Sequence, residues 1–386
     1  MKKFIFLVLG ILISSTILLS QTWSQIGDDI FGEGAHDLFG GSVSINSVGD
    51  IIAIGAKSNS GNGIDAGHVR IYQHIDGVWS QIGQDIDGEA EGDYFGSSVC
   101  LNSEGSIIAI GAPRYKHYTT YTYDGQVRIY QYIEGIWTQI GNDIYGEAAH
   151  DCFGNSVSLN SDGSIISIGA DYNDGNGDYS GHVRIYQYIE GIWTQIGSDI
   201  DGEAANDLFG RSISLNSDGS TIAIGAKNND GNGNNSGHVR IFQNIEGNWI
   251  QLGEDIDGEE SGERFGMSVS INDEGSVVGI GADLNDENGI DAGNVRVFEY
   301  GILKISNKEN SFTKIYPNPT SGILNLNFCG NNIHQIKVSD ITGKAIIERI
   351  EMQQNSTVDL SSFENGIYII SIKTDKEIFT TKIVKR

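Results

Sequence analysis

Residues 193 to 243 read Trp193-Thr-Gln-Ile-Gly197, then Asp207-Leu-Phe-Gly210, Ile222-Ala-Ile-Gly-Ala226 and Gly237-His-Val-Arg-Ile-Phe-Gln243. The same phrase begins at tryptophans 23, 79, 137, 193 and 249, with a spacing of 56 residues, or 58 after Trp79. The runs between the turn residues are short and β-branched, and none has the period of an amphipathic helix. A repeat of this length built from short strands predicts the blades of a β-propeller.

Each unit contains four candidate strands separated by turn residues. In the third unit the first strand alternates through Val157 and Leu159, the second is the apolar run 165–170, the third covers 183–186 and the fourth centres on Trp193. The apolar second strand needs cover on both faces, which a single sheet with one wet face does not provide. Blades stacked face to face around an axis do provide it, so we expect an all-β propeller with four-stranded blades.

Two short motifs recur inside the units. Phe-Gly occurs at 39, 95, 153, 209 and 265, and Ile-Gly-Ala at 54, 110, 168, 224 and 280, with one complete Gly111-Ala112-Pro113. Over residues 23 to 306 this pattern resembles the FG-GAP repeat of the integrin alpha-subunit propeller. The resemblance implies blades that usually number about seven, often with calcium loops between their first and second strands. Here that position holds only a short Asn-Ser-Asp-Gly turn, so the calcium role does not transfer to it.

The two ends of the repeat array predict how the ring closes. The unit that begins at Phe265 ends after Phe298 without a tryptophan strand, while the Trp23 phrase at the N-terminus belongs to no complete unit. The simplest closure lends the Trp23 strand to the last blade. We therefore expect five complete blades over residues 21–306.

The N-terminus predicts export. Residues 1–20 contain Lys2 and Lys3 followed by a short apolar run, which is typical of a cleaved secretory signal and short for a membrane span. We expect no transmembrane segment in the mature chain.

The charge of the repeats narrows the class of partner. Residues 23 to 306 hold 12 Lys and Arg against 43 Asp and Glu, a formal balance of −31, whereas residues 307 to 386 hold 10 against 8. Such an acidic body repels nucleic acid, which we exclude as a partner. The charge also serves solubility outside the cell.

The C-terminal residues have a different pattern. After a polar linker at 307–310, residues 311–386 show alternating apolar residues typical of a small β-sandwich. The Tyr316-Pro317-Asn318-Pro319 opening, the Gly366-Ile-Tyr368 strand and the basic last residues resemble the C-terminal sorting domain of the type IX secretion system. The resemblance implies that the secretion machinery is a partner, and that the protein reaches the outer-membrane cell surface or the extracellular space.

The sequence contains no recognisable catalytic motif. The cysteines Cys100, Cys152 and Cys329 occupy unrelated repeat positions, so we expect free thiols. Arginines 70, 128, 184, 240 and 296 recur on the third strand, and we expect ion pairs with the acids at 29, 85, 143, 199 and 255. Histidines 68, 182 and 238 share one position with Gln126 and Asn294, which favours hydrogen bonding at strand starts over a metal site.

Acidic loops suggest calcium as a candidate cofactor. Strand direction places the fourth-to-first loops and the second-to-third loops on one rim, which is rich in carboxylates. The candidate ligands are Asp171, Asn173, Asp174, Asp178, Asp283, Asn285, Glu287 and Asp291. The alternative is that these are hydrated acidic loops.

One loop breaks the repeat and carries the candidate partner-binding residues Tyr115, His117, Tyr118, Tyr121 and Tyr123. Tyrosines suit sugar stacking and protein contacts, but they could instead cover the edge of their own blade. We expect a secreted binding or adhesion protein that takes a surface glycan or protein ligand, and not an enzyme. An exported polysaccharide-acting enzyme and a passive surface-layer component are the alternatives.

Overall fold

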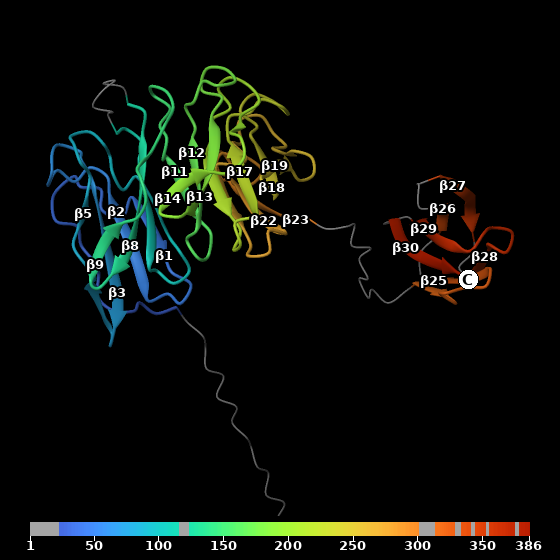
Figure 1. The fold of residues 1–386 in the computed structure, drawn as a ribbon. Coiled ribbons are helices and arrows are strands. Elements are labelled where there is room, and N and C mark those ends of the chain that lie inside the picture. The colour runs from blue at the N-terminus through green and yellow to red at the C-terminus, as the bar shows by residue number, and fades with distance from the viewer. Residues whose placement is uncertain are drawn as a thin grey trace, which may run out of the picture. The chain divides into compact units, whose positions relative to one another are not determined.

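The computed structural model of the chain describes residues 23–115, 123–300, 313–328, 333–340, 344–352, 355–374 and 378–386. The chain divides into two compact units, Met1–Tyr300 and Gly301–Arg386. All regular elements in these described ranges are β-strands (Figure 1), so the all-β expectation is confirmed. The predicted signal at 1–20 and linker at 307–310 lie outside the described residues.

The first unit contains five antiparallel sheets, numbered 1 to 5 in chain order. Sheet 1 holds β1 (Ser42–Ile45), β2 (Ile51–Ala56), β3 (His68–Ile75), β4 (Val78–Gln81) and β5 (Ile86–Asp87). Sheet 2 holds β6 (Ser98–Leu101), β7 (Ile107–Ala112), β8 (Gln126–Ile133), β9 (Ile136–Gln139) and β10 (Ile144–Tyr145). Sheet 3 holds β11 (Ser156–Leu159), β12 (Ile165–Ala170), β13 (His182–Ile189), β14 (Ile192–Gln195) and β15 (Ile200–Asp201). Sheet 4 holds β16 (Phe209–Leu215), β17 (Thr221–Ala226), β18 (His238–Ile245), β19 (Asn248–Gln251) and β20 (Ile256–Asp257), and sheet 5 holds β21 (Ser268–Ile271), β22 (Val277–Ala282) and β23 (Asn294–Glu299).

Sheets 1 to 4 have the four predicted strand positions, with the fourth broken in two. In sheet 3 the order is β11-β12-β13-β14, and the short β15 pairs with the other end of β13. Trp193 lies opposite Tyr188 in this sheet, and its indole nitrogen donates to the Ile140 carbonyl of the preceding repeat at 3.0 Å. The tryptophan therefore ties each sheet to the one before it, which explains why it recurs.

Consecutive sheets pack face to face, as a propeller requires. Val183 and Ile185 of sheet 3 form one core cluster with Phe209, Leu215 and other residues of sheet 4. The first strands of neighbouring sheets contact one another from β1 through β6, β11 and β16 to β21, so they form the inner edge of the array. Burial of the second and third strands between two sheets is why these strands are almost continuously apolar.

The joint between two sheets depends on a glycine. A Cβ atom added at Gly225 would lie 2.2 Å from the carbonyl oxygen of Gly266 in the next repeat, so only glycine permits this approach. The same Gly266 oxygen accepts a hydrogen bond from the Ser212 hydroxyl at 2.8 Å. On the opposite rim, the Ser217 amide donates to the Asp273 carbonyl at 3.2 Å. Equivalent contacts occur at the other three joints and fix the angle between sheets.

The predicted closure by the Trp23 strand is not present in the described residues. Sheet 5 ends at β23 with three strands, and residues 23–32 form no strand. Trp23 is fully exposed, at 105%. The Ile26 carbonyl instead accepts the Trp79 indole hydrogen bond at 2.9 Å, the same contact that links interior repeats. The N-terminal segment is therefore held on sheet 1, and the joints between sheets do not turn far enough to bring sheet 5 to it.

The second unit is the predicted β-sandwich. One sheet holds β24 (Thr313–Tyr316), β25 (Ile323–Phe328) and β28 (Asn355–Asp359), and the other holds β26 (Ile333–Asp340), β27 (Ala345–Met352), β29 (Gly366–Thr374) and β30 (Ile378–Lys385). Leu324, Leu326 and Val358 of the first sheet share a buried core with Ile336, Ile370 and Ile383 of the second.

The residues of the predicted sorting signature have structural contacts in this unit. Asn318 donates to the Lys382 carbonyl at 2.7 Å and accepts from the Val384 amide at 2.9 Å, which ties the start of the domain to its last strand. The peptide bonds before Pro317 and Pro319 are cis, and Tyr316 is half exposed. Tyr368 is buried and its hydroxyl donates to the Glu364 carbonyl at 2.7 Å, two residues before Gly366.

Candidate functional site

The recurring arginines lie between sheets and pair with acids. Arg70 and Arg184 contact Asp85 and Asp199, each with a shortest distance of 2.8 Å, as the sequence predicted. In the described residues, Arg128 and Arg240 form no ion pair with Asp143 and Asp255, the corresponding acids of their own repeats. Arg296 forms none with Asp29.

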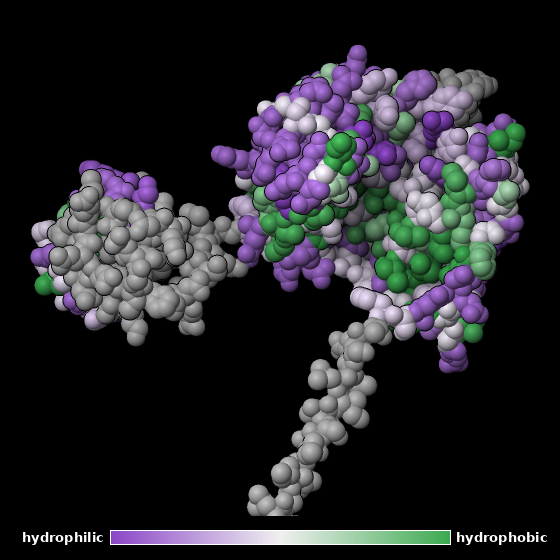
Figure 2. Space-filling view, turned by 180° about the vertical axis from the view of Figure 1, so that it is seen from behind, coloured by the Kyte–Doolittle hydropathy of each residue, from purple (hydrophilic) through white to green (hydrophobic). Residues whose placement is uncertain are grey.

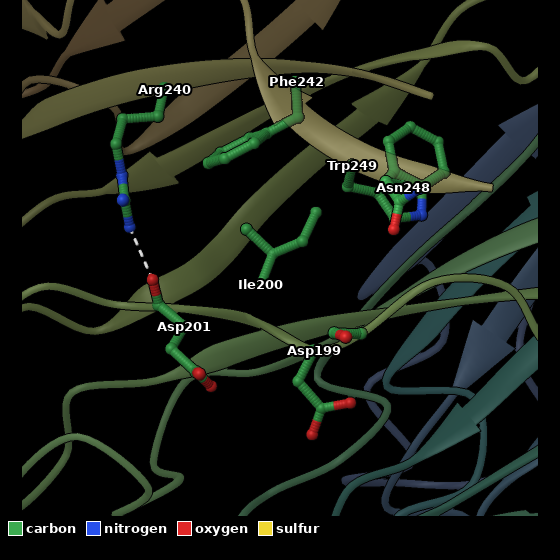
Figure 3. Close-up of a pocket in the computed structure, with 8 residues that line it drawn as sticks. Asp199, Ile200, Asp201, Arg240, Phe242, Asn248 and Trp249 are labelled. Atoms are coloured by element: carbon green, nitrogen blue, oxygen red, sulfur yellow. Dashed lines mark hydrogen bonds between the residues drawn. The ribbon is translucent and has the colours of Figure 1, made fainter. Parts of the chain in front are cut away.

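The partner common to all five arginines is a glutamate from the preceding repeat. The pairs are Arg70 with Glu33, Arg128 with Glu89, Arg184 with Glu147, Arg240 with Glu203 and Arg296 with Glu259. Figure 3 shows Arg240 of β18 reaching the Asp201 carbonyl of β15 at 2.6 Å. The Arg240 guanidinium also lies 4.3 Å from the centre of the Phe209 ring. Because these contacts join sheets and recur with the repeat, they are structural.

Three groups in the described residues have the composition of a metal site. They are Glu33, His68 and Asp85; Glu147, His182 and Asp199; and Glu203, His238 and Asp255, each with its candidate ligand atoms within 4.8 Å of one another. Burial lowers the pKa of His238 to about 4 and lowers that of His182 as well, so both imidazoles are neutral at pH 7. The recurring arginine pairs with a carboxylate of each group, however, and a metal ion would have to displace it.

The predicted calcium ligands are divided among separate local contacts. Asn173 is buried and donates to Asp151 at 3.1 Å, and Asn285 is buried and donates to Glu263 at 2.7 Å. Asp174 accepts from the Tyr179 amide at 2.7 Å within its own loop. The amides of Glu287 and Asp291 donate inside the second loop, and the Asp178 carbonyl accepts from the Asn206 amide at 2.7 Å. The described residues do not bring the carboxylates of this predicted set into one metal-binding group.

The two sets of rim loops do adjoin, as predicted. Asn176 of a second-to-third loop donates to the Gly202 carbonyl of a fourth-to-first loop at 2.8 Å, and Asn62 and Asn232 repeat this contact at 2.8 and 2.7 Å. Buried Asp151 and Asp207 accept hydrogen bonds from Asn173 and Asn229, so these carboxylates stabilise the loops.

The tyrosine loop is only partly described. Tyr115 is buried in the core, with its ring centre 5.7 Å from that of Tyr145, so it is not available to a partner. Tyr123 is 40% exposed and lies 6.0 Å from His150, measured between ring centres. His117, Tyr118 and Tyr121 lie outside the described residues.

A group of charged side chains that the sequence analysis did not assemble lies at the inner edge of the rim. It comprises Asp171 after β12, Arg211 in β16, Lys227 after β17, Arg264 before β21 and Asp283 after β22, and we call it the inner-rim cluster. Arg211 pairs with Asp171 at 3.4 Å, and Arg264 lies 3.9 Å from Asp283. Among the described residues, Lys227 has no ion pair.

The inner-rim cluster has unusual electrostatics. Burial raises the pKa of Asp171 to about 6, although Arg211 opposes this shift. One carboxylate oxygen of Asp171 is buried without a hydrogen-bond partner among the described residues. Burial also lowers the pKa of Lys227, with further contributions from the charges of Arg211 and Arg264. Asp171 and Asp283 oppose the effect of the arginines on Lys227, so the cluster holds three cations and two carboxylates in a domain whose balance is strongly negative.

The residues of this cluster differ from those at the same positions in the other units, and this difference is the sequence signal that could have revealed the cluster. The position of Arg211 holds Gly41, Ser97, Asn155 and Met267 in the other units, and that of Arg264 holds Leu38, Tyr94, Cys152 and Leu208. The position of Lys227 holds Lys57, Pro113, Asp171 and Asp283. A structural role predicts similar residues at each unit, so charges that change from unit to unit point to another role.

An exposed aromatic pair lies in the loop that starts at Asp171. Tyr172 and Tyr179 are 40% and 44% exposed, with ring centres 5.1 Å apart in an edge-to-face arrangement. Exposed tyrosines next to a charged cluster provide both apolar faces and hydroxyl groups to a ligand.

The chain matches two known families. Residues 199–242 match the FG-GAP repeat, and residues 314–386 match the secretion system C-terminal sorting domain. The chain contains an FG-GAP repeat and a type IX sorting domain. The sorting domain implies export by the type IX secretion system to the cell surface or the extracellular space. No curated protein matches the chain.

Several solved structures are similar in fold at low sequence identity. A Bacteroides uniformis protein assigned as a 6-phosphogluconolactonase is 13% identical, with a TM-score of 0.44, and the match covers 83% of this chain and 86% of that one. The periplasmic gluconolactonase of Pseudomonas aeruginosa is 14% identical, also with a TM-score of 0.44, over 83% and 88% of the two chains. In the described residues, no helix is long and apolar enough to cross a membrane.

Proposed function

We propose that this protein acts at the cell surface by binding an acidic glycan at the inner-rim cluster. The observation that carries the proposal is Lys227, which lies near Arg211 and Arg264 without an ion pair among the described residues. The two carboxylates of the cluster pair with Arg211 and Arg264, so one positive charge is left over, and a bound carboxylate or sulfate group would balance it.

A glycan is favoured over other anions because of the residues around the cluster. Arg211 and Arg264 offer planar donors that suit carboxylate and sulfate groups. Tyr172 and Tyr179 supply exposed ring faces for sugar stacking, and the unpartnered oxygen of Asp171 can accept a hydrogen bond from a sugar hydroxyl. The ligand is therefore a polymer that carries both acidic groups and hydroxyls.

The negative charge of the surrounding loops restricts the range of this attraction. At physiological ionic strength the Debye length is about 8 Å, so the distant acids are screened while the cluster acts on a ligand in contact. Binding should therefore be measured at that ionic strength, because low salt would exaggerate repulsion by the rim.

The test uses the full chain with polygalacturonate as an acidic probe and dextran as a neutral one. Lys227→Met should weaken polygalacturonate binding about 10-fold or more, which corresponds to about 1.4 kcal/mol. The matched control is Lys57→Met, because Lys57 occupies the same repeat position, is exposed and has Gly41 and Tyr94 in place of the two arginines. Calorimetry should show binding by the unmodified chain and by the Lys57 variant.

Three results would overturn the proposal. These are no binding of polygalacturonate, equal binding of dextran, or an equal loss in both lysine variants. Release of new reducing ends during the incubation would show catalysis and would replace binding with the enzyme alternative.

A further inference from the structure

The two ends of the sheet array expose residues that are buried at every interior joint. Val295 and Val297 of β23 are 71% and 68% exposed, whereas their equivalents in sheet 4, Val239 and Ile241, are 0% and 8% exposed. At the other end Ile45 is 57% exposed, while the equivalent residues of sheets 2 to 5 are 7–9% exposed. Figure 2 shows hydrophobic surface on both sides of a hollow in this unit.

The exposed surfaces correspond to the two sides of an interior joint. At each interior joint a Phe-Gly segment enters the preceding sheet next to a glycine; Gly237, for example, would place a Cβ atom 2.1 Å from the Phe265 carbonyl oxygen. The phenylalanines of this segment, Phe95, Phe153, Phe209 and Phe265, are fully buried. Phe39 is only partly buried, because no sheet precedes sheet 1.

Sheet 5 contains the complementary vacancy. Gly293, which corresponds to Gly237, meets only atoms of its own loop. A hollow of about 490 Å³ lies here, lined by residues that include Gly281, Gly293 and Val295. Its position relative to sheet 5 is the position that Phe265 occupies relative to sheet 4.

The polar groups of the two ends are complementary in the same way. At the last interior joint the Ser212 hydroxyl donates to the Gly266 carbonyl at 2.8 Å, and the Ser214 hydroxyl accepts from the Ile271 amide at 3.1 Å. The corresponding hydroxyls of sheet 5, on Ser268 and Ser270, make no such contact in the described residues. Their missing partners correspond to the Gly40 carbonyl and the Ile45 amide at the other end of the array.

We propose that copies of this chain associate head to tail, with the Phe39–Ile45 face of one copy packed on the sheet 5 face of another. The contact would repeat the joint between sheets 4 and 5. It would also bring the Trp23 segment of the arriving copy to the open edge of β23. That segment has the sequence of the fourth strand that sheet 5 lacks.

A second copy fits this interface better than the other end of the same chain. Each interior joint is fixed by the glycine contact, the serine hydrogen bonds and the backbone hydrogen bonds from Ser47 to Ser103, Ser103 to Ser161, Ser161 to Ser217 and Ser217 to Asp273. Closing the array within one chain would require several joints to bend. Association between copies leaves all of them unchanged, and because its two faces differ, it can continue from copy to copy.

Two charge substitutions test the interface on the full chain. Val297→Lys should prevent packing on the sheet 5 face, and Ile45→Lys should prevent packing on the sheet 1 face. Both positions are exposed, so the fold should be retained. Each variant alone should be monomeric in sedimentation experiments, with association weakened at least about 100-fold, because a charge would be buried without a partner. Ile192→Lys, at a position 57% exposed on a hairpin, is the matched control and should associate like the unmodified chain.

Mixing the two variants gives the decisive measurement. The Val297 variant retains an intact sheet 1 face and the Ile45 variant an intact sheet 5 face, so an equimolar mixture should form dimers and nothing larger. A mixture that stays monomeric while the unmodified chain associates would overturn the proposal. So would an unmodified chain that is monomeric at all concentrations and loses thermal stability with either substitution, because that result indicates closure within one chain.

Discussion

Sheets 4 and 5 contain nearly the same sequence in different surroundings. Val239 and Val295 occupy one repeat position, but the first is covered by the next sheet and the second is 71% exposed. The apolar residues of this repeat therefore serve mainly to pack one sheet against the next. Stability should accordingly be concentrated at the interior joints, as in other repeat proteins whose units contact only their neighbours.

The largest contrast is expected for the recurring phenylalanine. Phe209→Ala removes a fully buried ring from the joint between sheets 3 and 4, and should lower the free energy of unfolding by about 4 kcal/mol. Phe39→Ala at the open end should cost less than about 1 kcal/mol in the isolated chain, because this ring is only partly buried. Urea denaturation at low protein concentration compares the two, and similar losses would show that the first sheet is covered in solution.

A smaller contrast is expected for the joint glycine. A Cβ atom at Gly225 would collide with the Gly266 backbone, whereas at Gly281 it would meet only the Ser268 hydroxyl, at 2.5 Å, and that side chain can rotate away. Gly225→Ala should therefore destabilise the chain by about 3 kcal/mol and Gly281→Ala by less than about 1 kcal/mol. Thermal melts of both variants check the difference. Equal melting temperatures would contradict the tight approach of sheets at the interior joints.

The repeat pattern was sufficient to predict the strands but not the end of the array. The spacing of the tryptophans and the apolar runs such as 165–170 reflect contacts within one sheet, and the structure contains these strands in the predicted order. Closure by Trp23 depends on the angle between sheets, which arises from contacts such as the approach of Gly225 to Gly266. The sequence of a single unit does not determine that angle.

The partners of charged residues were harder to predict for a related reason. The acids at 85 and 199 lie 15 residues from their arginines in the same sheet, and those pairs were found. The recurring pairs between arginine and glutamate cross a joint between sheets. In the three pairs that are also hydrogen-bonded, such as Arg240 with Glu203, the two residues lie 37 to 39 positions apart in the sequence. The inner-rim cluster combines three units at positions that do not repeat, so periodicity could not reveal it.

The smallest expected effect concerns Asp171, which is buried at a position that is exposed in its equivalents Lys57 and Asp283. Its folded pKa of about 6 lies above the ordinary 3.8, so the folded state holds the proton more tightly than the unfolded state does. Asp171 therefore favours folding below about pH 4, and its contribution becomes unfavourable as the pH rises towards 6. The groups that face it are Arg211, Lys227 and Cys152.

Asp171→Asn removes this titration and should raise stability relative to the unmodified chain by about 2 kcal/mol between pH 4 and pH 6.5. The Arg211 pair forms only when Asp171 is ionised, so its effect is already part of this folded pKa, and the slope is the informative quantity. Asp283→Asn is the control, since this side chain is 43% exposed and should leave the slope unchanged. The measurement is the urea midpoint of the three proteins at closely spaced pH values. Parallel curves for the unmodified chain and the Asp171 variant would mean that solvent reaches this carboxylate, and the inner-rim cluster would then lack the desolvation on which its attraction for an acidic glycan depends.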